Sequence, residues 1–197
     1  MSLVLASASR ARRLILEAAG LELTADPAHL DESAIKARAR RDGLGAGQCA
    51  MLLAEAKAAQ VAHRHPGALV IGADQMLDCQ DEWLDKPRDL PDARRQLAML
   101  RGRAHTLHAA LAVACDGEVL WRHLEPARLV MRRFSDAFLD DYLGEMGEEV
   151  CATVGGYQLE GLGAQLFARI DGDYFAILGL PLLPLLAFLR DRGAVAA

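Results

Sequence analysis

The chain has 197 residues, of which 52% are hydrophobic and 25% are charged, and its formal net charge is -5 at pH 7. Length alone allows one large α/β domain or two small ones, and we take a single domain over residues 1–197. The mildly acidic balance and the dispersed arginines disfavour a nucleic-acid-binding protein, and a small anionic ligand held by a few cations fits better.

Local patterns disfavour two further classes of protein. The apolar run "FAILGLPLLPLLAFL" is broken by Gly179, Pro181 and Pro184, so we expect no membrane partner. The N-terminal "LVLA" is too short for the apolar segment of a signal peptide. The four cysteines form no C-x-x-C pair, and free thiols in a reducing cytoplasm are therefore the expectation.

In the first half of the chain, hydrophobic periodicity alternates between strands and helices. The expected elements are a buried strand over residues 3–6, a helix over 12–19 closed by Gly20, a helix over 33–42, a longer helix over 47–63, and the strand "ALVIGAD", which ends at Asp74. This alternation is typical of an α/β protein.

The second half begins with the polar stretch "DCQDEWLDKPRDLP", which we expect to be a loop. The elements expected after it are a helix over 91–101, three strands over 105–115, 118–124 and 127–133, a helix from the N-cap Ser135 to about Met146, the glycine-rich loop "TVGGYQLEGLG", strands over 165–170 and 174–178, and a final helix from Pro181. The predicted fold is a mixed sheet covered by helices, with a strand order that the sequence leaves open.

The first candidate site is the opening turn "LASASRARRL". A strand that ends in Ser7 and Ser9 and turns into a helix presents backbone N–H groups and the positive end of a helix dipole, which bind anions. Arg12 and Arg13 lie in the first turn, where the dipole disfavours cations, so something negative should offset them. The alternative is that Ser9 is only an N-cap and that the arginines are solvated surface charges.

The second candidate is Lys57 in the helix "QCAMLLAEAKAAQVA". Helical spacing places it in the same stripe as Ala50, Leu53, Ala54 and Val61. A buried ammonium group needs a carboxylate or a ligand phosphate beside it. The alternative is that the side chain extends outward to solvent along its aliphatic stem.

The third candidate is Asp74, which follows the apolar strand of "VIGADQ". The carboxyl end of a strand is the usual place for a site in an open α/β sheet, and an aspartate there binds a divalent metal or takes a proton from water. The alternative is a loop cap. Glu32 in "HLDES" and Lys86 in "LDKPRD" carry no signal on their own.

Considered together, these segments resemble the Maf family of nucleoside triphosphate pyrophosphatases. The resemblance rests on six segments that occur in the family's order: "LASASRARRLIL", "LDES", "LAEAKA", "VIGADQ", "LDKPRD" and "GGYQLEGLGAQLFARIDGDYFAILGLPL". It covers the chain from about Leu3 to Leu189. One position departs from the family, because Arg10 stands where a proline would make the opening turn rigid.

The resemblance implies roles for individual residues. Its catalytic set corresponds to Glu32, Lys57, Asp74 and Lys86, with Glu32 and Asp74 at the metal. The positions that it assigns to the substrate are Ser7, Ser9, Arg12 and Arg13 in the phosphate-contacting turn, Gln75 after the catalytic aspartate, and Gln158 and Glu160 in the loop that shapes the nucleotide pocket.

The resemblance also implies a fold and a reaction. The family fold is a mixed sheet wrapped by helices with a deep cleft, similar to the inosine triphosphatase type. The implied reaction hydrolyses a nucleoside triphosphate to the monophosphate and pyrophosphate with Mg²⁺ or Mn²⁺, in a cytoplasmic protein for which a homodimer is implied. An alternative is a nucleotide-binding regulator without turnover, because the family is also associated with arrest of septum formation.

Two segments imply different nucleotides. Gln75 and the stretch "LEGLGAQLF" look like the branch of the family that prefers 7-methylguanosine triphosphate. The stretch "GDYFAILGLPL" is similar to the branch that takes thymidine and uridine triphosphates. We favour a modified purine, and the alternative is an enzyme of broad specificity.

Overall fold

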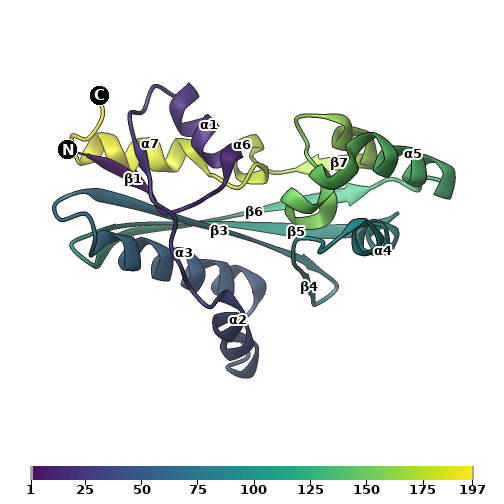
Figure 1. Ribbon diagram of the computed structural model, residues 1–197, viewed down its shortest axis with the longest axis horizontal. Helices are drawn as coiled ribbons and strands as arrows, with labels where there is room; N and C mark the ends of the chain where they lie inside the picture. The colour runs from purple at the N-terminus through teal and green to yellow at the C-terminus, as the bar shows by residue number, and fades with distance from the viewer. Residues whose placement is uncertain (1, 197) are drawn as a thin grey trace. The chain divides into compact units, whose positions relative to one another are not determined.

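The computed structural model describes residues 2–196 and contains a mixed β-sheet flanked by helices (Figure 1), which confirms the predicted fold class. The strands are β1 (Leu3–Leu5), β2 (Thr24–Ala25), β3 (Leu69–Cys79), β4 (Glu82–Leu84), β5 (Ala104–Cys115), β6 (Glu118–Met131) and β7 (Phe167–Asp171). The α-helices are α1 (Arg10–Ala18), α2 (Glu32–Arg41), α3 (Ala46–Ala62), α4 (Leu90–Leu100), α5 (Asp136–Met146), α6 (Tyr174–Ile177) and α7 (Leu182–Asp191). Short 3₁₀ turns are η1 (Gly147–Ala152), η2 (Val154–Gly156) and η3 (Leu162–Leu166).

Within residues 2–196 the strands form a seven-stranded sheet in the order β2-β1-β3-β5-β6-β7, with β4 paired to β3. β1 runs parallel to both β2 and β3, and its register with β3 places Leu3 opposite Leu69 and Leu5 opposite Ile71. β4 and β7 pair in the antiparallel direction with β3 and β6. The first three strands of the chain therefore form a parallel part of the sheet.

Contacts divide the chain into two compact units. The first unit takes the residues through Gln75, then Ala109–Glu125, and the residues from Asp173 onward. The second unit takes Met76–His108 and Pro126–Gly172. The single domain expected from the sequence stays a prediction.

The core of the first unit is apolar on both sides of its strands. β1 is buried along its whole length, as is most of β3, which is what parallel strands covered on both faces require. Figure 1 shows α1 and α7 on one side of these strands and α3 on the other. The residues that form the core on the α1 and α7 side include Leu5, Leu16, Ile71, Val113, Leu180, Leu185 and Leu189.

A glycine lets α3 lie unusually close to β3. A Cβ atom on Gly72 would collide with the carbonyl oxygen of Ala54 and lie 2.7 Å from the backbone nitrogen of Ala58. The facing positions on α3 are alanines, so neither element keeps the other at a distance. Because of this close approach, the side chain of Lys57 on α3 can reach Asp74 on β3.

The structure corrects the predicted end of the Asp74 strand. β3 continues for five residues past Asp74, to Cys79, and then turns into β4 inside the stretch that we predicted to be a loop. The turn residues Gln80 and Asp81 both have a positive φ, 55° and 66°, as the tight hairpin turns that match strand twist require. Neither residue is glycine, so the sequence carries no sign of this hairpin.

The structure corrects the predicted break between two strands and the nature of a third segment. The strands expected over 118–124 and 127–133 form one strand, β6, because Pro126 precedes the segment that pairs with β7 and its missing N–H does not interrupt that pairing. The segment 174–178 is helical in α6 rather than a strand, because Asp173 caps it by accepting a hydrogen bond from the Ala176 N–H at 2.8 Å. Over residues 2–196, no helix combines the length and the apolarity needed to cross a membrane.

Candidate functional site

The opening turn joins β1 to α1 through two serines. Ser9 is the N-cap of α1 and accepts a hydrogen bond from the Arg12 N–H, as the alternative interpretation had it, and the helix begins at Arg10 rather than Arg12. The Ser7 hydroxyl oxygen accepts a hydrogen bond from the Ser9 N–H at 3.2 Å. The turn is therefore held by its own side chains without the proline that the family resemblance led us to expect.

Arg12 ties three segments of the first unit together. Its Nε donates to the carbonyl oxygen of Gly179 at 2.9 Å, and its Nη1 donates to the carbonyl oxygen of Ala73 at 3.0 Å and to the hydroxyl of Ser7 at 3.2 Å. Burial lowers the pKa of the guanidinium group, and the negative charges of Asp74 and Glu32 oppose that effect. These carboxylates supply the negative charge that the sequence required near the first turn.

Arg13 lies elsewhere on α1. Its guanidinium group forms an ion pair with Glu17 at 2.8 Å, four residues further along the helix, and its side chain is 56% exposed. An exposed pair of this kind contributes little to stability. The predicted contact of Arg13 with a substrate stays a prediction.

Lys57 has carboxylates as its partners. Its Nζ lies 2.6 Å from Asp74 Oδ1 and 2.7 Å from Glu32 Oε1. The side chain is only 12% exposed, so the alternative in which it extends into solvent is wrong. The ammonium group thus joins an aspartate of β3 to the first residue of α2.

Asp74 lies within β3 and just past the end of its parallel neighbour. β1 stops pairing with β3 at Ile71, so the Asp74 side chain lies at the carboxyl edge of the parallel part of the sheet, where sites in α/β sheets occur. Burial raises the pKa of its carboxyl group, and the positive charges of Lys57 and Arg12 oppose that rise. A carboxylate with a raised pKa is better suited to accept a proton from water than an ordinary one.

Gln75 and Gly179 lie beside Arg12, next to the cluster formed by Glu32, Lys57 and Asp74. The Gln75 amide nitrogen donates to the carbonyl oxygens of Ala176 and Ile177 at 3.1 and 3.0 Å, at the end of α6. Gly179 has a φ of 90°, and a Cβ there would lie 3.4 Å from Arg12 Nη2 and 3.5 Å from Gln75 Oε1. Sequence reasoning missed Gly179, whose only signal was a glycine between the apolar residues of "ILGLPL".

The remaining predicted residues belong to the second unit. Lys86 is exposed and precedes the buried Pro87, and a Cβ on Gly156 would lie 3.7 Å from the Pro87 ring. The Lys-Pro segment therefore lies beside the glycine-rich loop that carries Gln158 and Glu160. Gln158 donates to a carboxylate oxygen of Glu149 at 3.3 Å, and Glu160 is exposed. The roles of these residues stay predictions.

The glycine-rich loop is anchored by buried polar groups that the sequence did not indicate. The His105 Nε2 atom lies 2.8 Å from the hydroxyl of Tyr157, and the Tyr142 hydroxyl donates to the carbonyl oxygen of Gly156 at 3.0 Å. The Thr153 hydroxyl donates to the carbonyl oxygen of Tyr157 at 2.8 Å. Burial lowers the pKa of His105 to about 4, so this ring is neutral at pH 7.

Because His105 is neutral in the folded chain and titrates near 6.5 when unfolded, protonation favours the unfolded state. Its contribution to stability is present above pH 6.5 and is lost as the pH falls toward 4, by about 3 kcal/mol in total. Urea unfolding between pH 7 and pH 4 should show this loss, and His105→Gln should have a flatter pH dependence. If the unfolding free energies of the two proteins changed equally with pH, the conclusion that His105 is buried in its neutral form would be contradicted.

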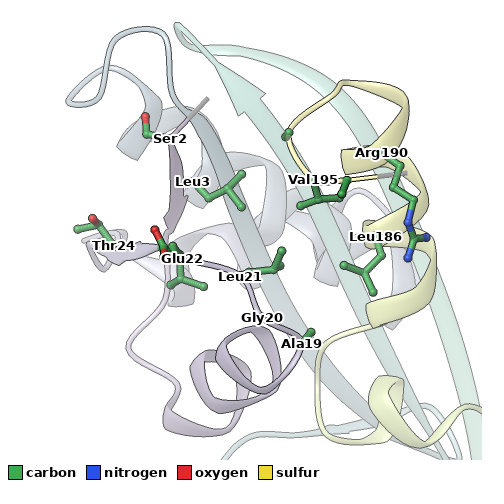
Figure 2. Close-up of a pocket in the computed structure, with 13 residues that line it drawn as sticks. Ser2, Leu3, Ala19, Gly20, Leu21, Glu22, Thr24, Leu186, Arg190 and Val195 are labelled. Carbon is green, nitrogen blue, oxygen red and sulfur yellow. The ribbon is translucent and has the colours of Figure 1, made fainter.

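A separate pocket lies at the other end of β1 (Figure 2). Ser2 and Leu3 line it at the start of the strand, and Leu186 and Arg190 line it from α7. Its lining includes none of the predicted site residues. The pocket and the Ser7 turn are therefore at opposite ends of β1.

The chemistry of Glu32 and Asp74 fits a divalent metal that is completed by other ligands. Both carboxylates contact the same ammonium nitrogen, so they face one point. Within residues 2–196, no group of three or more His, Cys, Asp and Glu side chains is arranged to hold a metal by itself. Mg²⁺ usually takes one or two protein carboxylates and fills its remaining positions with water and substrate phosphates.

The chain is similar to known proteins along almost its whole length. The family model described as "Maf-like protein" matches residues 2–192. A "Nucleoside triphosphate pyrophosphatase" of Paramagnetospirillum magneticum is 53% identical over 96% of this chain and 98% of its own length. One of the same name from Granulibacter bethesdensis is 50% identical over 99% of both chains. A "7-methyl-GTP pyrophosphatase" of Mesorhizobium japonicum is 48% identical over 98% of this chain and 97% of its own.

Proposed function

Because this chain belongs to the Maf-like protein family, we propose that it hydrolyses nucleoside triphosphates between the α and β phosphates, releasing the monophosphate and pyrophosphate. The observation that carries the proposal is that Lys57, only 12% exposed, contacts both Asp74 and Glu32 at the carboxyl edge of the parallel strands. In this arrangement the lysine supplies a cation for phosphate oxygens, and a carboxylate beside it supplies a base for water.

In this proposal, Asp74 orients the attacking water and takes its proton. The water oxygen bonds to the α phosphorus while the bond from that phosphorus to the bridging oxygen breaks, and pyrophosphate leaves. Burial keeps the Asp74 carboxylate out of bulk water, and its raised pKa favours proton uptake. Arg12 holds Ser7 and the Ala73 carbonyl in place, so the strand that carries Asp74 stays aligned with the opening turn.

Glu32 and Asp74 would hold Mg²⁺ or Mn²⁺, which supplies Lewis-acid stabilisation of the charge on the phosphate oxygens when it is bound. Lys57 would then move its contacts from the carboxylates toward the phosphates. Lys86 would add a second cation, and Gln158 and Glu160 would contact the base from the glycine-rich loop. The predicted deep cleft belongs to the same proposal.

We infer a modified purine nucleotide as the preferred substrate, since relatives at 47–48% identity are named 7-methyl-GTP pyrophosphatases. Other relatives, at 48–53% identity, carry only the general name, and the stretch "GDYFAILGLPL" favours thymidine and uridine triphosphates as the alternative. A cytoplasmic homodimer without a nucleic-acid partner completes the proposal.

The test is a panel of nucleoside triphosphates, including 7-methylguanosine triphosphate and the thymidine and uridine triphosphates, incubated with Mg²⁺ or Mn²⁺. We expect pyrophosphate and the monophosphate as first products, and loss of activity in excess chelator. Orthophosphate as the first product would refute cleavage at the α–β bond. Tight nucleotide binding without pyrophosphate release would favour the non-catalytic regulator.

A further inference from the structure

The segment that delivers Glu32 to Lys57 has no fully buried side chain and makes several polar contacts with the region of α3. We call residues 26–31, between β2 and α2, the strap. No residue from 22 to 38 is buried, whereas Leu21 and Ala39 on either side of this stretch are. Within the strap Pro27, Ala28 and Leu30 are only partly buried, so no apolar side chain anchors the strap in the core. The Glu32 side chain is 42% exposed, and an ion pair as exposed as the one that it forms with Lys57 is too weak to place a whole segment.

Gln60 on α3 both accepts a hydrogen bond from and donates one to the middle of the strap. The His29 N–H donates to Gln60 Oε1 at 2.8 Å, and the Gln60 amide nitrogen donates to the His29 carbonyl oxygen at 2.8 Å. The side chain thus satisfies both backbone groups of one residue, as a neighbouring strand would. Gln60 lies three residues after Lys57, so both side chains project from the same face of α3.

The start of the strap has a second attachment to the end of the same helix. The Asp26 carboxylate accepts hydrogen bonds from Arg64 at 2.9 and 3.0 Å and lies 2.8 Å from His65 Nε2. These hydrogen bonds lower the pKa of Asp26 to about 2. Arg64 also donates to the carbonyl oxygen of Pro27 at 3.1 Å. The strap ends at Asp31, the N-cap of α2, whose carboxylate accepts a hydrogen bond from the Ala34 N–H.

We infer that Gln60 is a positioning residue that places Glu32 against Lys57. The helix that carries the cation also sets, through Gln60 and His29, the point from which α2 begins. Since Glu32 is the first residue of α2, a shift of His29 moves its carboxylate away from Lys57 and Asp74. The effect on catalysis rests on the proposed function, whereas the attachment of the strap does not.

The experiment compares Gln60→Ala with the control Glu55→Ala. Glu55 lies on the same helix and forms an exposed ion pair with Arg122, so its loss removes contacts of similar strength away from the strap. Amide hydrogen exchange of residues 27–34 should become about tenfold faster in Gln60→Ala and stay unchanged in Glu55→Ala, as expected for the loss of two hydrogen bonds.

Measurements of kcat/KM test whether Gln60 positions Glu32 or has only a structural role. We expect kcat/KM to fall by about fivefold to tenfold in Gln60→Ala, with no further fall when Gln60→Ala is added to Glu32→Gln. Unchanged exchange, unchanged activity with faster exchange, or an equal loss in the Glu32→Gln background would each overturn the inference. A wild-type protein that releases no pyrophosphate would refute the proposed function instead, and the exchange comparison would still decide whether Gln60 holds the strap.

Discussion

Replacement of Asp74 with asparagine is expected to lower turnover by about a hundredfold or more, the range in which general bases contribute. The change keeps the shape of the side chain but removes its charge and its basicity. The chain should stay folded, because Lys57 retains its ion pair with Glu32 and Arg12 retains its bonds to Ser7 and two backbone carbonyls. Steady-state turnover and circular dichroism on the same sample measure both effects.

A suitable control for this variant is Asp42→Asn at the end of α2. Asp42 forms an exposed pair with Arg38 at 3.5 Å, so its neutralisation changes the net charge equally without touching the cluster. Turnover of the control should match the wild type. Near-normal turnover of Asp74→Asn with the same metal and substrate would remove Asp74 from the mechanism and make Glu32 the next carboxylate to examine.

Lys57→Met should lower turnover or nucleotide affinity by about tenfold or more, the effect of losing a charge-assisted contact. The structure adds a pH effect to this prediction. Lys57 opposes the rise in the pKa of Asp74 that burial causes, so its removal should raise that pKa further. The acidic limb of the pH–rate profile should therefore move to higher pH in Lys57→Met.

Stability has to be followed in parallel, since the substitution leaves Asp74 buried without its closest cation. Breaking a buried pair in this way costs about 3–5 kcal/mol of unfolding free energy. Lys57→Arg keeps the charge in a different shape and should recover stability more than activity. A pH–rate profile of Lys57→Met that coincides with that of the wild type would show that Lys57 does not act on Asp74.

Features set by neighbouring residues in the chain could be predicted from the sequence. Ser135 caps α5 as expected, because a cap depends only on a side-chain oxygen and the N–H groups that follow it. The position of Lys57 within an apolar stripe also required an anionic partner, and in the structure Asp74 and Glu32 both fill this role. Which anion it was could not be read from the pattern.

Other features depended on contacts that no local pattern records. Tyr174 to Ile177 is apolar enough for a strand, but the cap at Asp173 makes it helical. Gln80 and Asp81 adopt positive φ angles because β3 and β4 pair, although neither residue type favours that conformation as glycine does. Both errors arose where pairing or capping outweighed the hydrophobic pattern.

The sequence by itself determined that Lys57 lies in an apolar stripe and needs an anionic partner, and that Asp74 follows an apolar strand at a usual position for a site. Only the tertiary structure decided that they are partners of each other and of Glu32, because Gly72 and the alanines of α3 let the helix lie against β3. The contacts of Arg12 and Gln75 were out of reach of sequence reasoning for a different reason. Their acceptors are mainly backbone carbonyls, which every residue has, and chain folding alone selects the ones that meet a given side chain.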